Sequence, residues 1–552
     1  MPRSGAADAL VWMQEAVLRS RPLLNWQEAR GYGHSCLSPL APRLDEIPLT
    51  LASATPHHTG TDARHRCSLI RDTLIRDGIY RQPGKESAAD DTGLATHWRI
   101  SPDAFPLTAE QVAFLRSLGD RLLSFYRVLN RLYLESVRGT QPAWVHGYLD
   151  QGKPDWLVTY SRMKRFRDLV PAVIRPDIIP IDPEPSSNGS DLVITELDSV
   201  PGGIGLTGCL SRAYASLKDP HLEIVGGANG IVTGFADMLR RQLQSAPGPT
   251  GMPTGAMAIV VSEESRSYRP EMAWLAAHLR ENALEVHCVE PREVRFTEEA
   301  LLVNTESGER PISVLYRFFE LFDLKNVPKS ELFMYGAKKD RVVITPPFKP
   351  ALEEKLAFAL LHHPLLASFW SRELGDETFL LLRRLMPRTW VLDPRPVPPS
   401  AVIPDLRVGG HAVADWRDVA SASQKDRRFV IKPSGFSALA WGSRGVSVGH
   451  DLPQGEWAAA LEAALAAFPT TPHVLQEFHK GRQFSLAYYD PAADDVLPMA
   501  GRVRLSPYYF VTGHGAELAG VLATACSPEK KLIHGMRDAI MAPCATTVKR
   551  EA

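Results

Sequence analysis

The sequence predicts an α/β protein built from several domains, and three observations carry that prediction. The chain has 552 residues, which is too long for one hydrophobic core and suggests roughly three or four domains or subdomains. Residues 192–195, Leu-Val-Ile-Thr, are typical of a strand because they are rich in β-branched side chains. Leucines and a phenylalanine between 115 and 132 recur at alternating spacings of three and four, as on one face of a long helix.

Composition and charge exclude several classes of protein. Hydrophobic residues make up 44% of the chain and charged residues 23%, which is ordinary for a globular protein. The formal net charge is −1, so we expect no nucleic-acid partner and no attraction to an anionic membrane. Residues 1–16 carry acids within their apolar stretch and do not resemble a signal peptide, and no apolar run is long enough to cross a bilayer. A cytoplasmic location is therefore expected.

The cysteines do not indicate a metal centre or a disulfide framework. They are scattered, and none forms a C-x-x-C pair. We expect free, buried thiols in a reducing compartment. The six residues are Cys36, Cys67, Cys209, Cys288, Cys526 and Cys544.

The first 150 residues are expected to form a helical N-terminal region. Residues 1–105 carry little chemistry that can be interpreted. Thr108 and Gln111 have the spacing of a capping box at the start of a helix that runs to about residue 132. A core helix is the more common fate of such a pattern, and a coiled-coil partner is the alternative.

The stretch 175–208 predicts an antiparallel strand pair that gathers acidic side chains. Residues 178–181 and 192–195 are apolar runs separated by a Pro, Ser, Asn and Gly loop. Glu196 and Asp198 are two apart and so lie on one side of an extended chain. With Asp177 or Asp182 from the first run, they would attract a hard cation such as Mg²⁺, with substrate phosphates as further ligands. The alternative is a hairpin with solvated acids.

The glycines after this pair carry a competing signal. Gly203, Gly205 and Gly208 match G-x-G-x-x-G before a helix, which suits a dinucleotide pyrophosphate. The acidic strand end and the lack of a clear βαβ unit argue against that interpretation.

The middle of the chain predicts a small subdomain with parallel strands. A Pro- and Gly-rich linker covers residues 245–255. Strands are expected at 256–262, 284–289 and 311–318, with a helix between the first two.

The last third predicts a lysine-rich anion site. Lys355 is expected on a helix, and Lys432 ends a strand that is followed by a loop of small residues. Such a loop binds polyphosphate through backbone N–H groups, although it is not a Walker loop. A later strand ends in Gln476 and Glu477. Arg502 and Arg504 then lie two apart on one face of a strand.

Taken in order, these parts resemble the ATP-grasp ligases, in the circularly permuted branch that contains eukaryotic glutathione synthetase and glutathionylspermidine synthetase. The resemblance covers roughly residues 155–545 and rests on the order of the motifs. Glu196-Leu197-Asp198 stands where that branch has a Glu-x-Asn strand, and Lys432 stands in VIKPSGF where it has an ATP lysine. Arg317 in LYRFFE and the stretch 265–271, SRSYRPE, are similar to substrate-binding segments.

The resemblance implies a circularly permuted ATP-grasp fold. Its two parts would be residues 151–250 and 331–552, with the inserted α/β substrate subdomain at 256–330. The metal ligands would be Asp177, Glu196 and Asp198, with Asp182 as the fallback. ATP would contact Lys355, Lys432, Ser434, Gly435, Gly442, Gly445, Gln476, Glu477 and Arg504. The catalytic residues would be Arg502, Arg504 and Lys432. The substrate would contact Arg317, Ser267, Glu271, Ser199 and Gly202.

The function that the resemblance implies is ATP-dependent, Mg²⁺-dependent ligation of a small carboxylate to an amine through an acylphosphate, with residues 434–449 as a lid. A homodimer is also an expectation. Two departures matter: Asp198 replaces the usual Asn, and Ser434, Gly435 and Phe436 follow Lys432 where glutathione synthetase has a glutamate ligand. A nucleotide-binding scaffold without turnover, or a dinucleotide-dependent oxidoreductase using the 203–208 glycines, are the alternatives.

Overall fold

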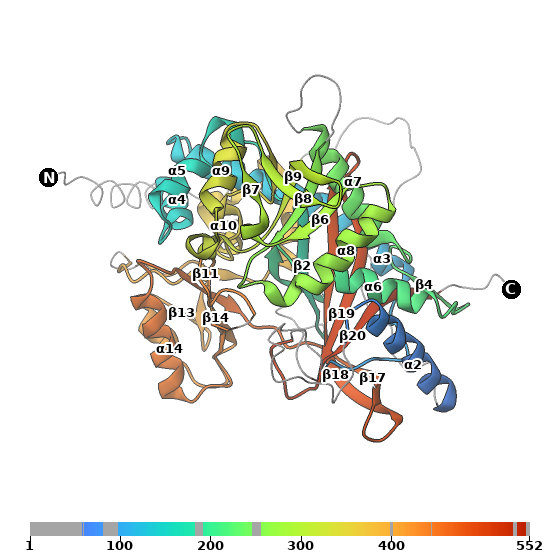
Figure 1. Ribbon diagram of the computed structural model, residues 1–552. Coiled ribbons are helices and arrows are strands. Elements are labelled where there is room, and N and C mark those ends of the chain that lie inside the picture. Colours follow the sequence, from blue (N-terminus) through green and yellow to red (C-terminus); the bar gives the residue numbers. More distant parts are fainter. Residues whose placement is uncertain are drawn as a thin grey trace, which may run out of the picture. The chain divides into compact units, whose positions relative to one another are not determined.

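The computed structural model describes residues 58, 60–80, 98–182, 191–245, 255–397, 401–442, 444–533 and 538–547. All of them belong to one compact unit, residues 49–552. This unit is a mixed α/β structure with several sheets, as the sequence predicts (Figure 1). Cys36 lies outside the described residues.

The largest sheet joins segments from distant parts of the chain: three late strands, red in Figure 1, lie side by side between strands from the first 200 residues. Its path is β1 (Phe105–Leu107), β20 (Ile540–Thr547), β19 (Gly515–Cys526), β18 (Asp495–Thr512), β2 (Val173–Pro180) and β3 (Leu192–Asp198), while β17 (Gln483–Asp490) pairs with β18 and β4 (Leu222–Ile224) with β20. The predicted antiparallel pair is confirmed as β2 and β3. Its register sets Asp177 opposite Glu196 and Arg175 opposite Asp198.

The predicted long helix is confirmed as α3 (Ala109–Val137), and its capping box between Thr108 and Gln111 is present. Its apolar side chains are buried in the main core, and the helix packs against β19, so it is a core helix. The other helices that pack around this core are α2 (Gly60–Arg76), α4 (Ala143–Asp150), α6 (Ile204–Ala215), α7 (Gly230–Gln244) and α8 (Arg269–Glu281), whereas α5 (Asp155–Ser161) packs into the core of the second sheet.

A second sheet contains the predicted parallel strands. Its order is β6 (Val286–Val289), β5 (Ala256–Val261), β9 (Gly308–Phe318), β8 (Leu301–Thr305) and β7 (Arg295–Phe296), and β10 (Val343–Thr345) also pairs with β9. β5 is parallel to β6 and to β9, and β10 is parallel to β9. This sheet therefore extends past residue 330 to include β10, after α9 (Ser330–Lys338).

A third sheet carries the predicted lysine strand. Its order is β11 (Thr389–Val391), β16 (His473–Glu477), β14 (Phe429–Pro433) and β15 (Ser447–Val448). It has its own core, in which Trp457 and Leu461 of α14 (Gln454–Ala466) meet Leu475. The nearby short elements are β12 (Arg407–Val408), β13 (His411–Ala412) and α13 (Trp416–Ala420), and α10 (Ala357–His362), α11 (Ala367–Leu374) and α12 (Asp376–Leu385) precede β11.

One predicted placement is wrong. Lys355 does not lie on a helix, because α10 begins only at Ala357. The Lys355 N–H donates instead to the carbonyl of Ser434 at 2.8 Å, and the Leu356 N–H donates to the Ser434 hydroxyl at 3.0 Å. These two long-range bonds hold the residues before α10 in a turn.

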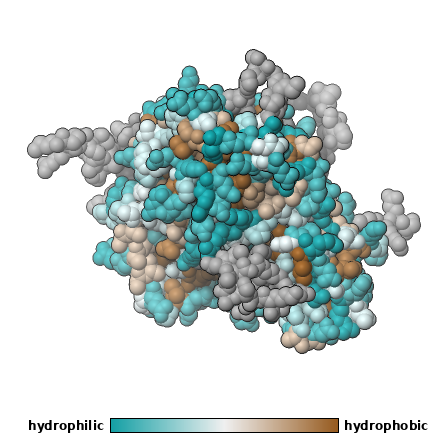
Figure 2. All heavy atoms as spheres, viewed as in Figure 1, coloured by the Kyte–Doolittle hydropathy of each residue, from teal (hydrophilic) through white to brown (hydrophobic). Residues whose placement is uncertain are grey.

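The described surface and helices give no sign of a membrane-spanning segment. Among the described residues, every helix is too short or too polar to cross a bilayer. On the face seen in Figure 2, hydrophilic residues predominate and hydrophobic residues appear in separate groups.

Candidate functional site

Two lysines from distant parts of the chain meet beside β3. Lys432, on β14, donates through Nζ to Gln476 Oε1 at 2.8 Å and to the Thr195 carbonyl at 3.4 Å. Lys355 Nζ pairs with Glu196 Oε1 at 2.7 Å and donates to the Ala440 carbonyl at 2.8 Å. Because Thr195 and Glu196 are neighbours on β3, both ammonium groups reach the same place.

The electrostatics of the two lysines differ. Burial lowers the pKa of Lys432 to about 8, and the Lys355 charge acts in the same direction against the pull of Glu196. Burial also disfavours the Lys355 ammonium, but its contact with Glu196 outweighs this and raises the Lys355 pKa. Lys432 therefore contacts only neutral acceptors directly, while Lys355 has a carboxylate. A bound anion would relieve the unbalanced charge at Lys432.

The carboxylates of β2 and β3 are held by arginines. Arg175 Nε lies 3.2 Å from Asp177 Oδ1, and Arg175 Nη2 lies 3.2 Å from Asp198 Oδ2. Arg504 Nη1 lies 3.1 Å from Asp177 Oδ2, and Ser506 donates to Asp177 Oδ1 at 3.1 Å. Although Asp177 is buried, Arg175 and Arg504 lower its pKa. Sequence reasoning missed Arg175, whose only signal was its place two residues before Asp177 on a strand.

This arrangement does not fit one magnesium ion. Within the described ranges, no three His, Cys, Asp or Glu side chains are grouped to hold a metal. The Arg175 guanidinium lies between Asp177 and Asp198, and Glu196 pairs with Lys355 instead. The fallback ligand, Asp182, is exposed and pairs with Arg482 at 3.0 Å. In place of a cluster of three carboxylates, these residues form a set of carboxylate–cation pairs.

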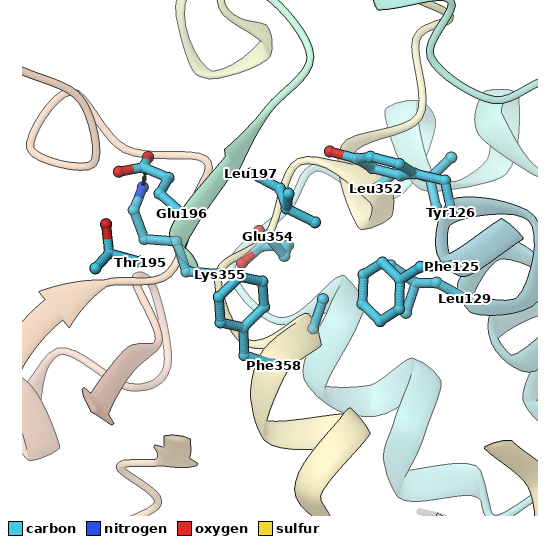
Figure 3. Close-up of a pocket in the computed structure, with 11 residues that line it drawn as sticks. Phe125, Tyr126, Leu129, Thr195, Glu196, Leu197, Leu352, Glu354, Lys355 and Phe358 are labelled. Atoms are coloured by element: carbon cyan, nitrogen blue, oxygen red, sulfur yellow. Dashed lines mark ion pairs between the residues drawn. The ribbon is translucent and has the colours of Figure 1, made fainter. Parts of the chain in front are cut away.

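A small pocket adjoins the Lys355–Glu196 pair. Figure 3 shows the charged pair at one end and aromatic and aliphatic side chains from α3 and the start of α10 at the other. The lining residues are Phe125, Tyr126, Leu129, Thr195, Glu196, Leu197, Leu352, Glu354, Lys355, Ala357 and Phe358. An apolar wall beside an ion pair lowers the local dielectric and so strengthens the charge interactions of any ligand bound there.

The residues after Lys432 shape the Lys355 turn. The Ser434 N–H donates to the Pro472 carbonyl at 2.8 Å, and its hydroxyl, fully buried, contacts the Glu354 carboxylate. A side chain on Gly435 would bring its Cβ within 2.6 Å of the Glu353 carbonyl, so only glycine allows this close approach. Ser434 and Gly435 thus pack against the Lys355 turn, and their contact with ATP stays a prediction.

The other residues that were predicted to contact ATP are Gln476, Glu477, Gly442 and Gly445. Gln476 is buried and its amide is shared between Lys432 and Thr389, so it orients Lys432. Burial raises the pKa of Glu477, which is half-buried beside it. Gly442 has a φ of +64°, which glycine favours, and Gly445 donates to the Leu439 carbonyl at 3.1 Å. These two glycines set the path of the loop.

Two predicted arginines are used inside the protein. Arg502 is 6% exposed, and it donates to the Gly481 carbonyl at 3.1 Å and to the Pro528 carbonyl. Arg317 has no exposed surface, pairs with Glu353, and donates to the Phe319 carbonyl at 2.5 Å and the Pro346 carbonyl at 3.3 Å. Both guanidinium groups have partners within the protein, and the substrate role of Arg317 and the catalytic role of Arg502 stay predictions.

The backbone of the glycine motif is bound by the Glu271 carboxylate. The Glu271 carboxylate accepts hydrogen bonds from the Gly203 and Leu206 N–H groups, at 2.7 and 2.8 Å. It therefore occupies the N-terminus of α6, where a pyrophosphate would bind in the dinucleotide interpretation. A Cβ on Gly205 would lie 2.0 Å from the Glu271 carbonyl, so this glycine permits contact between α6 and α8. Glu271 thus acts as a helix cap, and its contact with a substrate stays a prediction.

The remaining residues that were predicted to contact the substrate are Gly202, Ser199 and Ser267. The Gly202 carbonyl accepts from Tyr508 Oη at 2.8 Å and from Arg175 Nη1 at 3.2 Å. Ser199 is buried, and Ser267 is half-buried in a 3₁₀ turn, Arg266–Tyr268. Gly208 packs on Trp274, whose ring a Cβ there would approach to 2.8 Å.

Comparison with known proteins gives little. No family model and no curated protein matches the chain. Among solved structures, the chain is similar to a glutathione synthetase-like effector from Globodera pallida in its apo form, with 11% sequence identity and a TM-score of 0.49. That similarity covers 88% of this chain and 96% of the other.

Proposed function

We propose that the protein binds ATP beside β3 and uses it to join a carboxylate to an amine, releasing ADP. The convergence of Lys355 and Lys432 on the two neighbouring residues Thr195 and Glu196 carries this proposal. In the cluster around β2 and β3, four cations (Lys355, Lys432, Arg175 and Arg504) face the three carboxylates Asp177, Glu196 and Asp198. The extra positive charge is half-buried, which favours a polyphosphate over a neutral ligand.

The ligase part of the proposal rests on the order of motifs that resembles the permuted ATP-grasp ligases. In such a reaction the γ-phosphoryl group moves to the substrate carboxylate, and the amine then displaces phosphate from the acylphosphate. Lys355 and Lys432 would neutralise the charge that develops on the transferring group. Each well-placed donor in a water-poor site typically contributes roughly 3 to 4 kcal/mol. Arg175 and Arg504 would hold Asp177 in a fixed position behind them.

The resemblance also implies Mg²⁺. Because Asp177, Glu196 and Asp198 are each paired with a side-chain cation, they do not fit a shared ion in this arrangement. No step proposed for these residues passes through a metal.

The first test is ATP binding to the full chain by isothermal titration calorimetry. We expect Lys432→Ala to weaken ATP binding by roughly tenfold or more, because one charge-assisted contact is worth roughly 1.5 to 3 kcal/mol. Lys480→Ala is the matched control, since Lys480 is exposed and follows the neighbouring strand β16. Equal affinities in the wild type and in both variants would overturn the site.

Turnover separates a ligase from a scaffold. ATP is incubated with the protein and pooled small carboxylates and amines, and ADP and phosphate are measured. Release that requires both substrate classes supports ligation. ATP binding without any release would identify a nucleotide-binding scaffold instead.

A further inference from the structure

Two buried hydroxyl groups without partners lie at the carboxyl edge of the parallel strands. Within the described part of the chain, Tyr316 Oη on β9 and Thr345 Oγ1 on β10 form no hydrogen bond. Tyr316 is 0% exposed and Thr345 is 2% exposed. A buried hydroxyl that has lost water and gained no partner destabilises the fold, so such groups call for an explanation. Both strands end here, and ligands of parallel sheets bind beyond the carboxyl ends of strands.

The two hydroxyls lie on the same face of the sheet. Tyr316 and Thr345 are direct partners in the parallel register of β9 and β10. Val314, Tyr316 and Phe318 belong to the main core, whereas Leu315 and Phe319 belong to the core on the other side. Since side chains alternate along a strand, Tyr316 and Thr345 face the main sheet, where β3 ends at Asp198.

An acidic residue without a partner follows on the same strand. Glu320 comes two residues after β9 and is half-buried, and its side-chain carboxylate neither accepts a hydrogen bond nor forms an ion pair with any described residue, although its backbone carbonyl accepts from the Asp323 N–H. Burial, Glu353 and Asp198 together raise the pKa of Glu320 to about 8. Burial and Asp198 likewise raise the pKa of Tyr316 far above its usual value. The Asp198 charge therefore acts on both Tyr316 and Glu320.

The neighbouring carboxylates differ from Glu320 because they have cations. Glu353 pairs with Arg317, and Asp198 pairs with Arg175. Glu320 is therefore the one carboxylate of the three that no described side chain neutralises. A ligand carboxylate would find no counter-charge here. A protonated amine would supply both the missing positive charge and N–H donors for the orphaned hydroxyl oxygens.

We propose that Glu320, Tyr316 and Thr345 form a subsite for the ammonium group of an amine ligand, with Asp198 facing it from β3. This subsite is connected to the lysines, because Arg317, next to Tyr316 on β9, pairs with Glu353, two residues before Lys355. On the proposed ligase function, the amine bound here is the nucleophile that attacks the activated carboxylate. Binding of the amine to this subsite does not require ATP.

The test is binding of 1,4-diaminobutane and n-butylamine to the full chain without nucleotide, with butyrate and 1-butanol as probes of matched size. We expect the two amines to bind and the other two probes not to bind. Glu320→Gln keeps the size of the side chain but removes the charge, and should weaken amine binding by roughly tenfold or more. Glu331→Gln on α9 is the control, because Glu331 is exposed.

A second variant separates binding from folding. Tyr316→Phe removes only the orphaned hydroxyl, so the melting temperature should stay the same or rise, while amine affinity should fall several-fold. Failure of the wild type to bind either amine, or equal affinities in the wild type and Glu320→Gln, would overturn the subsite. The two proposals can fail separately. If the protein binds amines but Lys432→Ala does not change the affinity for ATP, the subsite is supported and the ligase function is rejected.

Discussion

At the scale of single residues, Lys432 differs from most buried lysines because its hydrogen-bond acceptors are neutral. Its Nζ contacts the Gln476 amide oxygen and the Thr195 carbonyl, and Glu196 pairs with Lys355. Burial holds the Lys432 pKa at about 8, well below that of a free lysine. An arriving polyphosphate would stabilise the ammonium form. Nucleotide binding should therefore be coupled to proton uptake at this residue.

The pH dependence of that coupling has a definite sign. Below pH 8 Lys432 is already charged and ATP affinity should not change through this group. Above pH 8 binding must take up a proton, so affinity should fall as pH rises, by up to about tenfold per pH unit. Calorimetry at pH 7, 8 and 9 measures this. Lys432→Arg should remove the dependence because arginine stays charged, and a slope equal in the wild type and this variant would contradict the assignment.

At the scale of elements, α8 stabilises α6 through one side chain. The Glu271 carboxylate accepts two N–H groups at the start of α6, where a helix leaves its donors unsatisfied. Burial outweighs these bonds and raises the pKa of Glu271 to about 7. The protonated form is thus favoured in the folded protein relative to the unfolded chain.

The free energy of unfolding should depend on the protonation of the Glu271 carboxyl group. Its contribution is fully present below the unfolded pKa of 4.5 and is lost as pH rises through about 7, a change of roughly 3 kcal/mol. Urea unfolding at pH 5 and pH 7.5 should show that change in the wild type but not in Glu271→Gln, with other groups contributing equally to both. Glu281→Gln, at the exposed end of α8, serves as the control. Parallel pH profiles for the wild type and Glu271→Gln would show that the carboxyl group does not titrate in this range.

Local sequence patterns predicted elements well when one segment determined them. The Thr108 capping box, the strand pair 178–181 with 192–195, and the strand that ends at Lys432 depend on residues close in sequence. The Lys355 turn was missed because its hydrogen bonds come from Ser434, far along the chain. A helical pattern in the local sequence does not show which distant residue will be its hydrogen-bond partner.

The candidate site was predictable only in part, for the same reason. The pattern indicated that Lys355, Lys432 and Glu196 carry chemistry, and the structure brings them together. It could not show that Arg175 would lie between Asp177 and Asp198, because that depends on cross-strand register. Nor could it show that Arg317 and Glu271 would be used internally, because burial and partners are properties of the folded chain.

At the scale of the whole molecule, the last described strand is an interior strand of the largest sheet. β20 lies between β1 and β19, and residues 105–107 and 540–547 are therefore adjacent. We expect deletion of residues 538–552 to abolish cooperative unfolding, because it exposes two strand edges and part of the main core. Thermal melting followed by circular dichroism measures this. A truncated chain that melts as sharply as the full chain would contradict it.

This position of β20 also constrains synthesis. While the ribosome is still making the third sheet, β1 and the β2–β3 pair have emerged without the strands β18, β19 and β20 that join them. The parallel sheet of residues 256–345 is complete much earlier, since its strands are close in sequence. The nascent chain thus carries unpaired strand edges until β20 appears, and such edges favour aggregation. The demand for chaperones during translation should accordingly be set by the synthesis of β20.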